Sequence, residues 1–212
     1  NQKFFNPETG VYAEGTQTAQ ALALYLGLVP KGKEQLVADK LREVVAGNNY
    51  FLDFGLLGSK TVPAMLTKYG YIEDAMKMIT KTEAPSWGYW VETMGYSTLP
   101  ETWTLSPKFA DASLNHVFMG DVSAWMMNQL AGINHDDSAP GFRHIRITPH
   151  FVKELDWAKG EYHSVRGLIS SQWKREGGKL TLTVTIPSGC TADIRVGDKT
   201  ETVGSGTYVN TY

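Results

Sequence analysis

The sequence has one cysteine, Cys190, and no surplus of charge of either sign. A single cysteine excludes an internal disulfide and the four-cysteine zinc sites, although it leaves the compartment open. Twenty Lys and Arg residues stand against 22 Asp and Glu residues, so the chain has no basic excess for nucleic acid. The longest apolar run, residues 21–29, is far shorter than the ~18 residues of a membrane-spanning helix. The sequence therefore predicts neither a nucleic-acid partner nor a membrane span.

Common motifs for nucleotides, nucleophiles and metals are also missing. The chain contains no phosphate loop of the form G-x-x-x-x-G-K-[ST], no G-x-G-x-x-G after a strand and no G-x-S-x-G elbow. No two of its five histidines are four residues apart, so no pair shares one face of a helix as metal ligands. The run from His135 to Asp137 fits a solvated loop better than a metal site. We therefore expect no cofactor and no metal.

The pattern of apolar residues changes near Pro140. Before it, the spacing is helical; after it, apolar and polar residues alternate as in strands. We therefore predict an α+β chain, with a helical domain over 1–139 and a small antiparallel β-sandwich over 140–212. The predicted helices cover about 18–28, 33–46, 61–69, 72–79 and 113–130, and the predicted strands cover 144–148, 168–173, 180–186, 192–196 and 207–209.

The segment from Pro85 to Trp103 differs from the rest of the chain. Its 19 residues hold three of the six tryptophans, two tyrosines and two glutamates, and no Lys or Arg. Prolines and glycines interrupt any helix or strand period, which indicates a long connecting loop, and long ordered loops are usually functional. Aromatic rings beside carboxylates suit the apolar faces and hydroxyl edges of sugars. The composition favours a carbohydrate site, with tryptophans that merely fill the core as the alternative.

A glycosidase needs two carboxyl groups, one acid and one base or nucleophile. Glu101, between Pro100 and Trp103, is the preferred candidate, and Glu92 is its competitor. The residues alone leave both possible. His116 is predicted in the first turn of a helix, where it could face a ligand or be an ordinary packed histidine; the residues alone favour the packed one. Weaker carboxylate candidates are Asp53, Asp111 and Asp121.

At these positions the sequence resembles a known family. The blocks at 85–89, 97–103 and 113–116, with Gly120 and Trp125, are similar to the C-terminal half of bacterial α-L-rhamnosidases, glycoside hydrolase family 78. Further blocks at 17–24, 27–30, 131–133 and 140–142 fit in the same order. The resemblance implies the C-terminal half of an (α/α)6 barrel followed by a β-sandwich. It also implies inverting hydrolysis of terminal α-L-rhamnosides in glycans or glycosides.

The resemblance also assigns roles to residues. The family's base lies in a block similar to A-T-T-x-W-E-x-W, in which Glu101 takes the place of the glutamate and Trp103 that of the last tryptophan. The family's sugar-contacting histidine corresponds to His116, which reverses the preference for a packed histidine. Trp87 and Glu92 are expected to contribute to substrate binding. Pro100 departs from the pattern, since the family usually has tryptophan there.

A second departure is an absence. The family's general acid lies in an upstream block similar to D-x-x-x-R-D-E-R, which these 212 residues do not contain. The chain starts at Asn1 rather than at Met and shows five or six of the twelve helices of such a barrel. We therefore expect the C-terminal part of a larger enzyme, inactive without the N-terminal half as its partner. The alternative is a non-catalytic carbohydrate-binding module.

Overall fold

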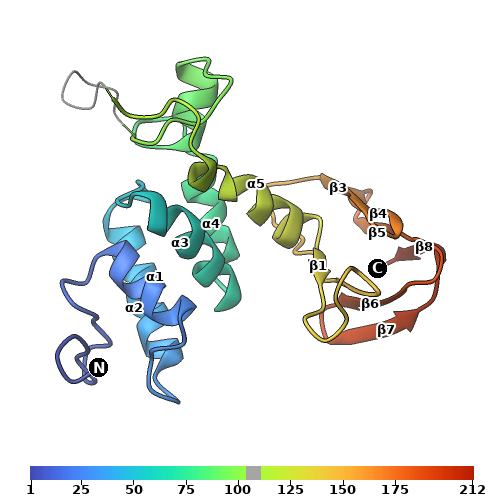
Figure 1. Ribbon diagram of the computed structural model, residues 1–212, viewed down its shortest axis with the longest axis horizontal. Coiled ribbons are helices and arrows are strands. Elements are labelled where there is room, and N and C mark those ends of the chain that lie inside the picture. Colours follow the sequence, from blue (N-terminus) through green and yellow to red (C-terminus); the bar gives the residue numbers. More distant parts are fainter. Residues whose placement is uncertain (104–110) are drawn as a thin grey trace. The chain divides into compact units, whose positions relative to one another are not determined.

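The computed structural model describes residues 1–103 and 111–212. Contacts divide the chain into two compact units, Asn1–Val122 and Ser123–Tyr212. The first is mainly helical and the second mainly β, as the sequence predicts (Figure 1). The sequence predicts a boundary between two domains at 139/140. That position stays a prediction. Within the described residues no helix is both long and apolar enough to cross a membrane.

Four α-helices form the core of the first unit: α1 (Gln17–Tyr25), α2 (Glu34–Gly47), α3 (Leu56–Lys68) and α4 (Ile72–Ile79). Their apolar stripes pack α1 against α2 and α3, and α3 against α4 (Figure 1). Thr16 caps α1, because its side chain accepts a hydrogen bond from the Ala19 N–H. Two consecutive helical hairpins result, as the periodicity predicts.

Helix α3 begins five residues before the predicted start at Thr61, because Gly58 is part of the helix rather than a break. A Cβ at Gly58 would lie 2.3 Å from Cβ of Phe54 and 2.8 Å from Oγ1 of Thr18. Glycine is therefore required for the close approach of α1 to α3. The sequence alone shows only a residue that is unfavourable in helices, not the contact that makes it necessary.

The prediction of one long helix over 113–130 is wrong for its first turn. Residues 113–116 are non-helical, and the segment continues as a 3₁₀ helix η3 (Val117–Gly120), an α-helix α5 (Asp121–Trp125) and a π-helix η4 (Met126–Leu130). Backbone hydrogen bonds from the 113–116 segment go to residues around Leu99 and Glu101 instead. These long-range partners outweigh a helical turn that apolar spacing alone favours.

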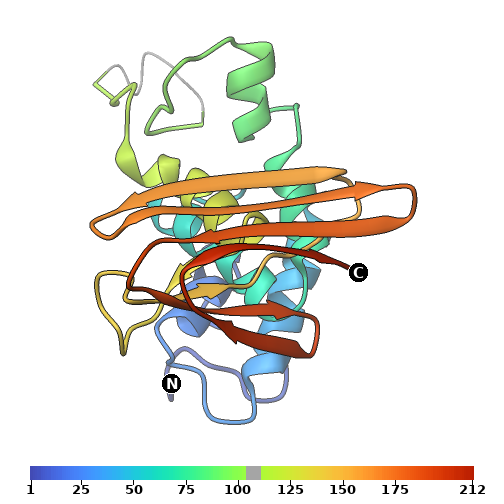
Figure 2. The same cartoon turned by 90° about the vertical axis from the view of Figure 1, so that its right-hand side faces the viewer.

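The second unit is a β-sandwich of two four-stranded sheets, which confirms the predicted fold class (Figure 2). One sheet has the order β1-β2-β6-β7 and the other β3-β4-β5-β8. All pairs are antiparallel except β2 and β6, which run parallel. The sequence predicted a purely antiparallel sandwich, and this one pair differs from that prediction. The strands are β1 (Ile133–His135), β2 (His144–Ile147), β3 (Trp157–Ser164), β4 (Gly167–Glu176), β5 (Lys179–Ile186), β6 (Thr191–Val196), β7 (Lys199–Val203) and β8 (Gly206–Thr211).

The core of the sandwich consists of alternate residues from the inner faces of both sheets. Trp173 of β4 is the largest of them and is fully buried. Its indole N–H donates a 2.8 Å hydrogen bond to the Leu130 carbonyl oxygen, and the ring of Phe151 packs edge-on at 5.4 Å between centroids. The indole is therefore satisfied both as an apolar surface and as a donor.

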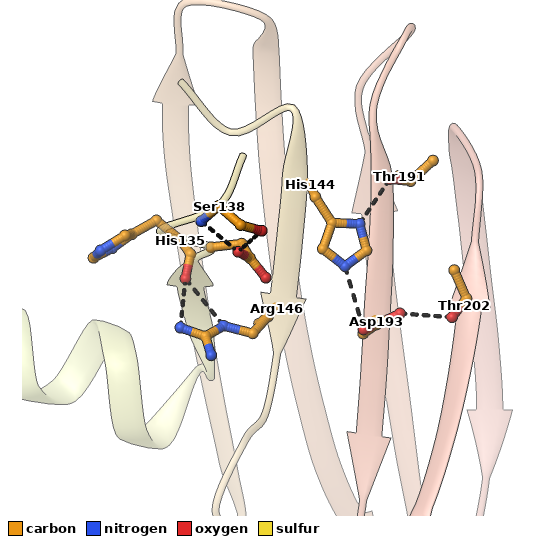
Figure 3. A network of polar contacts seen from close by, with 8 residues as sticks. His135, Ser138, His144, Arg146, Thr191, Asp193 and Thr202 are labelled. Atoms are coloured by element: carbon orange, nitrogen blue, oxygen red, sulfur yellow. Dashed lines mark hydrogen bonds and ion pairs between the residues drawn. The ribbon is translucent and has the colours of Figure 1, made fainter. Parts of the chain in front are cut away.

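A chain of polar side chains links strands β2, β6 and β7 (Figure 3). His144 contacts the Thr191 hydroxyl through Nδ1 at 2.7 Å and the Asp193 carboxylate through Nε2 at 3.3 Å. The Thr202 hydroxyl donates to Oδ1 of Asp193 at 2.6 Å. This hydrogen bond is the main reason that the pKa of Asp193 lies below its ordinary value, and the contact with His144 adds to the effect.

We expect Thr202→Val to destabilise the sandwich by about 0.5 kcal/mol at neutral pH, the low end for one hydrogen bond, because this pair is exposed to solvent. A carboxyl whose folded pKa is lowered stabilises the fold above its unfolded pKa, and this contribution is lost as the pH falls through the folded pKa. The difference from the native chain should therefore shrink as the pH falls below about 4, the ordinary pKa of an aspartate. Urea unfolding at a series of pH values measures it, and an equal difference at all pH values would contradict this account.

Candidate active site

Glu101 lies in a non-helical segment that pairs with the segment before η3. The Glu101 N–H donates to the Ser113 carbonyl oxygen at 2.8 Å, and the Ser113 N–H donates to Oε2 of the Glu101 carboxylate at 3.1 Å. Both the backbone and one carboxylate oxygen are thus fixed by the same residue. In the described part of the chain, Oε1 is left as the oxygen that can meet a ligand or water.

The same pairing positions His116. Its N–H donates to the Leu99 carbonyl oxygen at 2.8 Å, two residues before Glu101. Its Nδ1 accepts a hydrogen bond from the Phe118 N–H at 3.3 Å, so His116 caps η3. An acceptor nitrogen carries no proton, so the neutral ring holds its proton on Nε2. His116 is half-buried and can offer Nε2–H as a donor.

A cluster of four aromatic rings supports the segment that carries Glu101. Trp103 stacks on Trp90 with 4.3 Å between ring centroids, and the ring of Trp87 meets Trp103 edge-on at 5.4 Å. Phe54 completes the cluster, and its carbonyl oxygen accepts a hydrogen bond from the Trp103 indole N–H. Trp103 is held on several sides, so the backbone two residues away at Glu101 has a rigid base.

The structure places the remaining predicted residues differently. Trp87 is only 4% exposed, and its indole N–H donates to the Met119 carbonyl oxygen at 3.0 Å. In this chain it packs against Trp103 and presents no open face. Glu92 lies in the short π-helix η1 (Tyr89–Thr93) and is exposed. The structure therefore connects the backbone near Glu101 with that near His116, and the Trp103 cluster supports the same segment. The roles of all five residues stay predictions.

Three supporting residues were not identified from the sequence as parts of the site. Ser113 anchors the carboxylate, while Trp90 and Phe54 hold Trp103. Trp90 lies inside the segment from Pro85 to Trp103. The many aromatic residues of that segment were a signal from which Trp90 could have been identified. Phe54 lies 49 residues away from Trp103, and only the packing of the loop on the start of α3 brings the two together.

This arrangement suits proton transfer beside a neutral, hydroxyl-bearing ligand. It offers a fixed carboxylate, an imidazole whose Nδ1 is already an acceptor, and an aromatic surface. Among the described residues, no group of three or more His, Cys, Asp or Glu side chains is placed to hold a metal ion.

Two family models match the chain. Residues 1–130 match the bacterial α-L-rhamnosidase 6 hairpin glycosidase domain, and residues 132–209 match the bacterial α-L-rhamnosidase C-terminal domain. Among curated relatives, an α-L-rhamnosidase of Streptomyces avermitilis is 30% identical over 185 residues, which are 84% of this chain. One from an Alteromonas species is 27% identical over 90% of the chain. The chain spans only 18% and 21% of the lengths of these two relatives.

Solved structures show the same likeness. A native α-L-rhamnosidase from Aspergillus terreus superposes with a TM-score of 0.91 at 28% identity, covering 99% of this chain and 25% of that one. The Streptomyces avermitilis α-L-rhamnosidase complexed with L-rhamnose gives a TM-score of 0.90 at 26% identity, covering 100% of this chain and 23% of that one.

Proposed function

Because this chain belongs to the bacterial α-L-rhamnosidase family, we propose that it forms part of an enzyme that hydrolyses terminal α-L-rhamnosides with inversion. The observation that carries the proposal is the anchored carboxylate of Glu101, on a segment that pairs with the segment of His116 and is supported by the Trp103 cluster. The substrate would be a rhamnose-containing glycan or glycoside. Two matching domains of a hydrolase family favour this activity over a non-catalytic carbohydrate-binding module.

In the proposed reaction, Glu101 is the general base. Oε1 takes a proton from a water molecule, whose oxygen attacks the anomeric carbon. The bond to the leaving oxygen breaks at the same time, and the general acid gives that oxygen its proton. The hydrogen bond from the Ser113 N–H to Oε2 fixes the direction of the carboxylate. A positioned base of this kind contributes about 10²–10⁴-fold to the rate.

His116 and Trp103 have binding roles in this proposal. The Nε2–H of His116 would donate to a sugar hydroxyl, because Nδ1 is already an acceptor for the Phe118 N–H. Trp103, half-buried, would contact the apolar face of the sugar with the part of its ring that the cluster leaves open. Trp87 would act through Trp103, and the exposed Glu92 would contribute at the edge of the site.

The family's acidic block has no counterpart in the 212-residue sequence, and the four described helices α1 to α4 form two hairpins of a six-hairpin domain. We therefore place the acid and the other hairpins in the N-terminal half of the enzyme, outside this chain. In an inverting enzyme the acid should lie about 6.5–9.5 Å from Glu101, which leaves room for the attacking water.

The stereochemistry of the product tests the function. The enzyme that contains this chain is mixed with an aryl α-L-rhamnoside, and the anomeric protons of the released sugar are followed by NMR. We expect β-L-rhamnose to appear first and to convert slowly to the mixture of anomers. If α-L-rhamnose appears first, the mechanism is not inverting; if no rhamnose is released, the proposed activity is wrong.

A further inference from the structure

The β-sandwich unit contains a pocket of its own. It has a volume of about 380 Å³ and lies beside the connection between β1 and β2. The side chains that matter for its chemistry are His135, Asp136, Asp137, Phe142 and Tyr162. None of them has a part in the proposed hydrolytic reaction. Loops at the ends of a sandwich are frequent binding surfaces because the sheets hold them rigidly.

Two aromatic rings form one wall of the pocket. Phe142 and Tyr162 pack with 4.9 Å between ring centroids at an interplanar angle of 43°. Phe142 also packs against the sandwich core, which fixes the wall, whereas Tyr162 is 44% exposed. The backbone of Phe142 has φ +57, an unusual value for a bulky residue. The neighbouring turn is held by a 3.0 Å hydrogen bond from Nε of Arg166 to the Gly141 carbonyl oxygen.

The polar side of the pocket offers acceptors. Asp136 accepts hydrogen bonds on Oδ1 from the Ser138 N–H at 2.8 Å and the Ser138 hydroxyl at 2.6 Å, which lower its pKa. The charge of Arg146 adds to this lowering of the Asp136 pKa. Figure 3 shows the Arg146 guanidinium, which donates to the His135 carbonyl oxygen. Oδ1 of Asp137 lies 3.0 Å from Nε2 of His135. Ionised carboxylates accept hydrogen bonds and cannot donate them, so they suit a ligand with hydroxyl groups.

We propose that this pocket binds one residue of a neutral saccharide, with the sugar's apolar face against Tyr162 and its hydroxyls toward Asp136 and Asp137. The lining agrees with this ligand class, because it combines aromatic side chains with carboxylates in a concave site. No Lys or Arg is among the described lining residues, which disfavours an anionic ligand. The inference goes beyond the proposed hydrolysis and does not depend on it.

The test measures binding of methyl α-L-rhamnoside and methyl β-D-glucoside to the full chain by saturation-transfer NMR and calorimetry. A single shallow sugar site typically has weak affinity, so we expect dissociation constants of about 0.1–10 mM. Tyr162→Ala should weaken binding at least tenfold. Tyr212→Ala is the matched control, because Tyr212 is a tyrosine of nearly equal exposure, 45%, outside the pocket. Its backbone hydrogen bonds with Leu180 survive the substitution.

Further variants separate the pocket from the Glu101 site. His116→Ala removes the proposed hydrogen-bond donor to a sugar at the Glu101 site and should leave binding to this pocket unchanged. Asp137→Asn, at an exposed position, should weaken binding to this pocket without affecting the fold. The proposal is overturned if neither sugar binds, if Tyr162→Ala and Tyr212→Ala behave alike, or if His116→Ala alone removes binding. It is also overturned if the cation benzyltrimethylammonium binds at Tyr162 while both sugars do not. These outcomes measure sugar binding in the pocket, so they do not depend on whether the Glu101 site hydrolyses rhamnosides.

Discussion

Glu101→Gln should lower kcat of the enzyme that contains this chain by about 10²–10⁴-fold, with KM changed little. The amide keeps the shape of the side chain, and its oxygen can still accept the hydrogen bond from the Ser113 N–H. It cannot take a proton from water, so the chemical step becomes slower. The expected loss of rate corresponds to a rise of about 3–5 kcal/mol in the activation free energy. Initial rates with an aryl α-L-rhamnoside measure the effect.

Two further variants make this result specific. Glu83→Gln is the matched control, since Glu83 is exposed, lies near the same segment and has no part in the proposed site; it should retain native activity. Glu92→Gln tests the competing assignment. Activity that survives Glu101→Gln and is lost in Glu92→Gln would move the base to Glu92 and contradict the role given to Glu101.

Chemical rescue separates a catalytic effect from a structural one. Glu101→Ala creates space for azide, which attacks the anomeric carbon without needing a base. Turnover should recover as azide is added, with β-L-rhamnosyl azide as the product while the leaving oxygen still takes its proton from the acid. If the variant is folded and azide restores nothing, Glu101 is not the base.

Trp173→Ala should destabilise the β-sandwich by about 3–5 kcal/mol, the usual cost of removing a large aromatic side chain from a core. The indole is fully buried between the sheets, and the Leu130 carbonyl oxygen would lose its donor. Against a typical stability of about 5–15 kcal/mol for a domain, this loss is large. Urea unfolding followed by far-UV circular dichroism, with hydrogen exchange at the amides of β4 and β5, measures it.

Trp157→Ala is the matched control for this prediction. Trp157 lies on β3, and its register partner on the neighbouring strand is Lys174, next to Trp173, but its side chain is 60% exposed. Its removal should change the stability by about 0.5 kcal/mol or less. Similar losses in the two variants would show that Trp173 does not have the central place in the core that the structure gives it.

Local patterns predicted the elements whose ends are marked by local chemistry. Helix α4 covers Ile72–Ile79 as the sequence predicts, and the hairpin between β4 and β5 turns at Gly177 and Gly178, which both have positive φ. Strand β3 was not predicted, because most of its side chains are exposed and its charged residues hide the alternation. It is a strand because β4 pairs with it along its whole length.

The candidate site also has a part that the sequence predicts and a part that depends on tertiary contacts. The density of aromatic residues marked the segment around Glu101, and the resemblance singled out Glu101 and His116. Neither could place them, because Glu101 and Ser113 are twelve residues apart in the chain and meet only through long-range backbone pairing. That pairing also explains why the helix predicted from Ser113 does not start there.

By itself, the sequence determined that this protein has a helical part, a β part and one aromatic, acidic segment with the residue types of a sugar site. These follow from periodicity and composition, which are local properties. Only the tertiary structure decided which oxygen of Glu101 is anchored, which nitrogen of His116 accepts, and that Trp87 is buried while Tyr162 is open. Such facts depend on contacts between residues far apart in sequence, and no local pattern contains them.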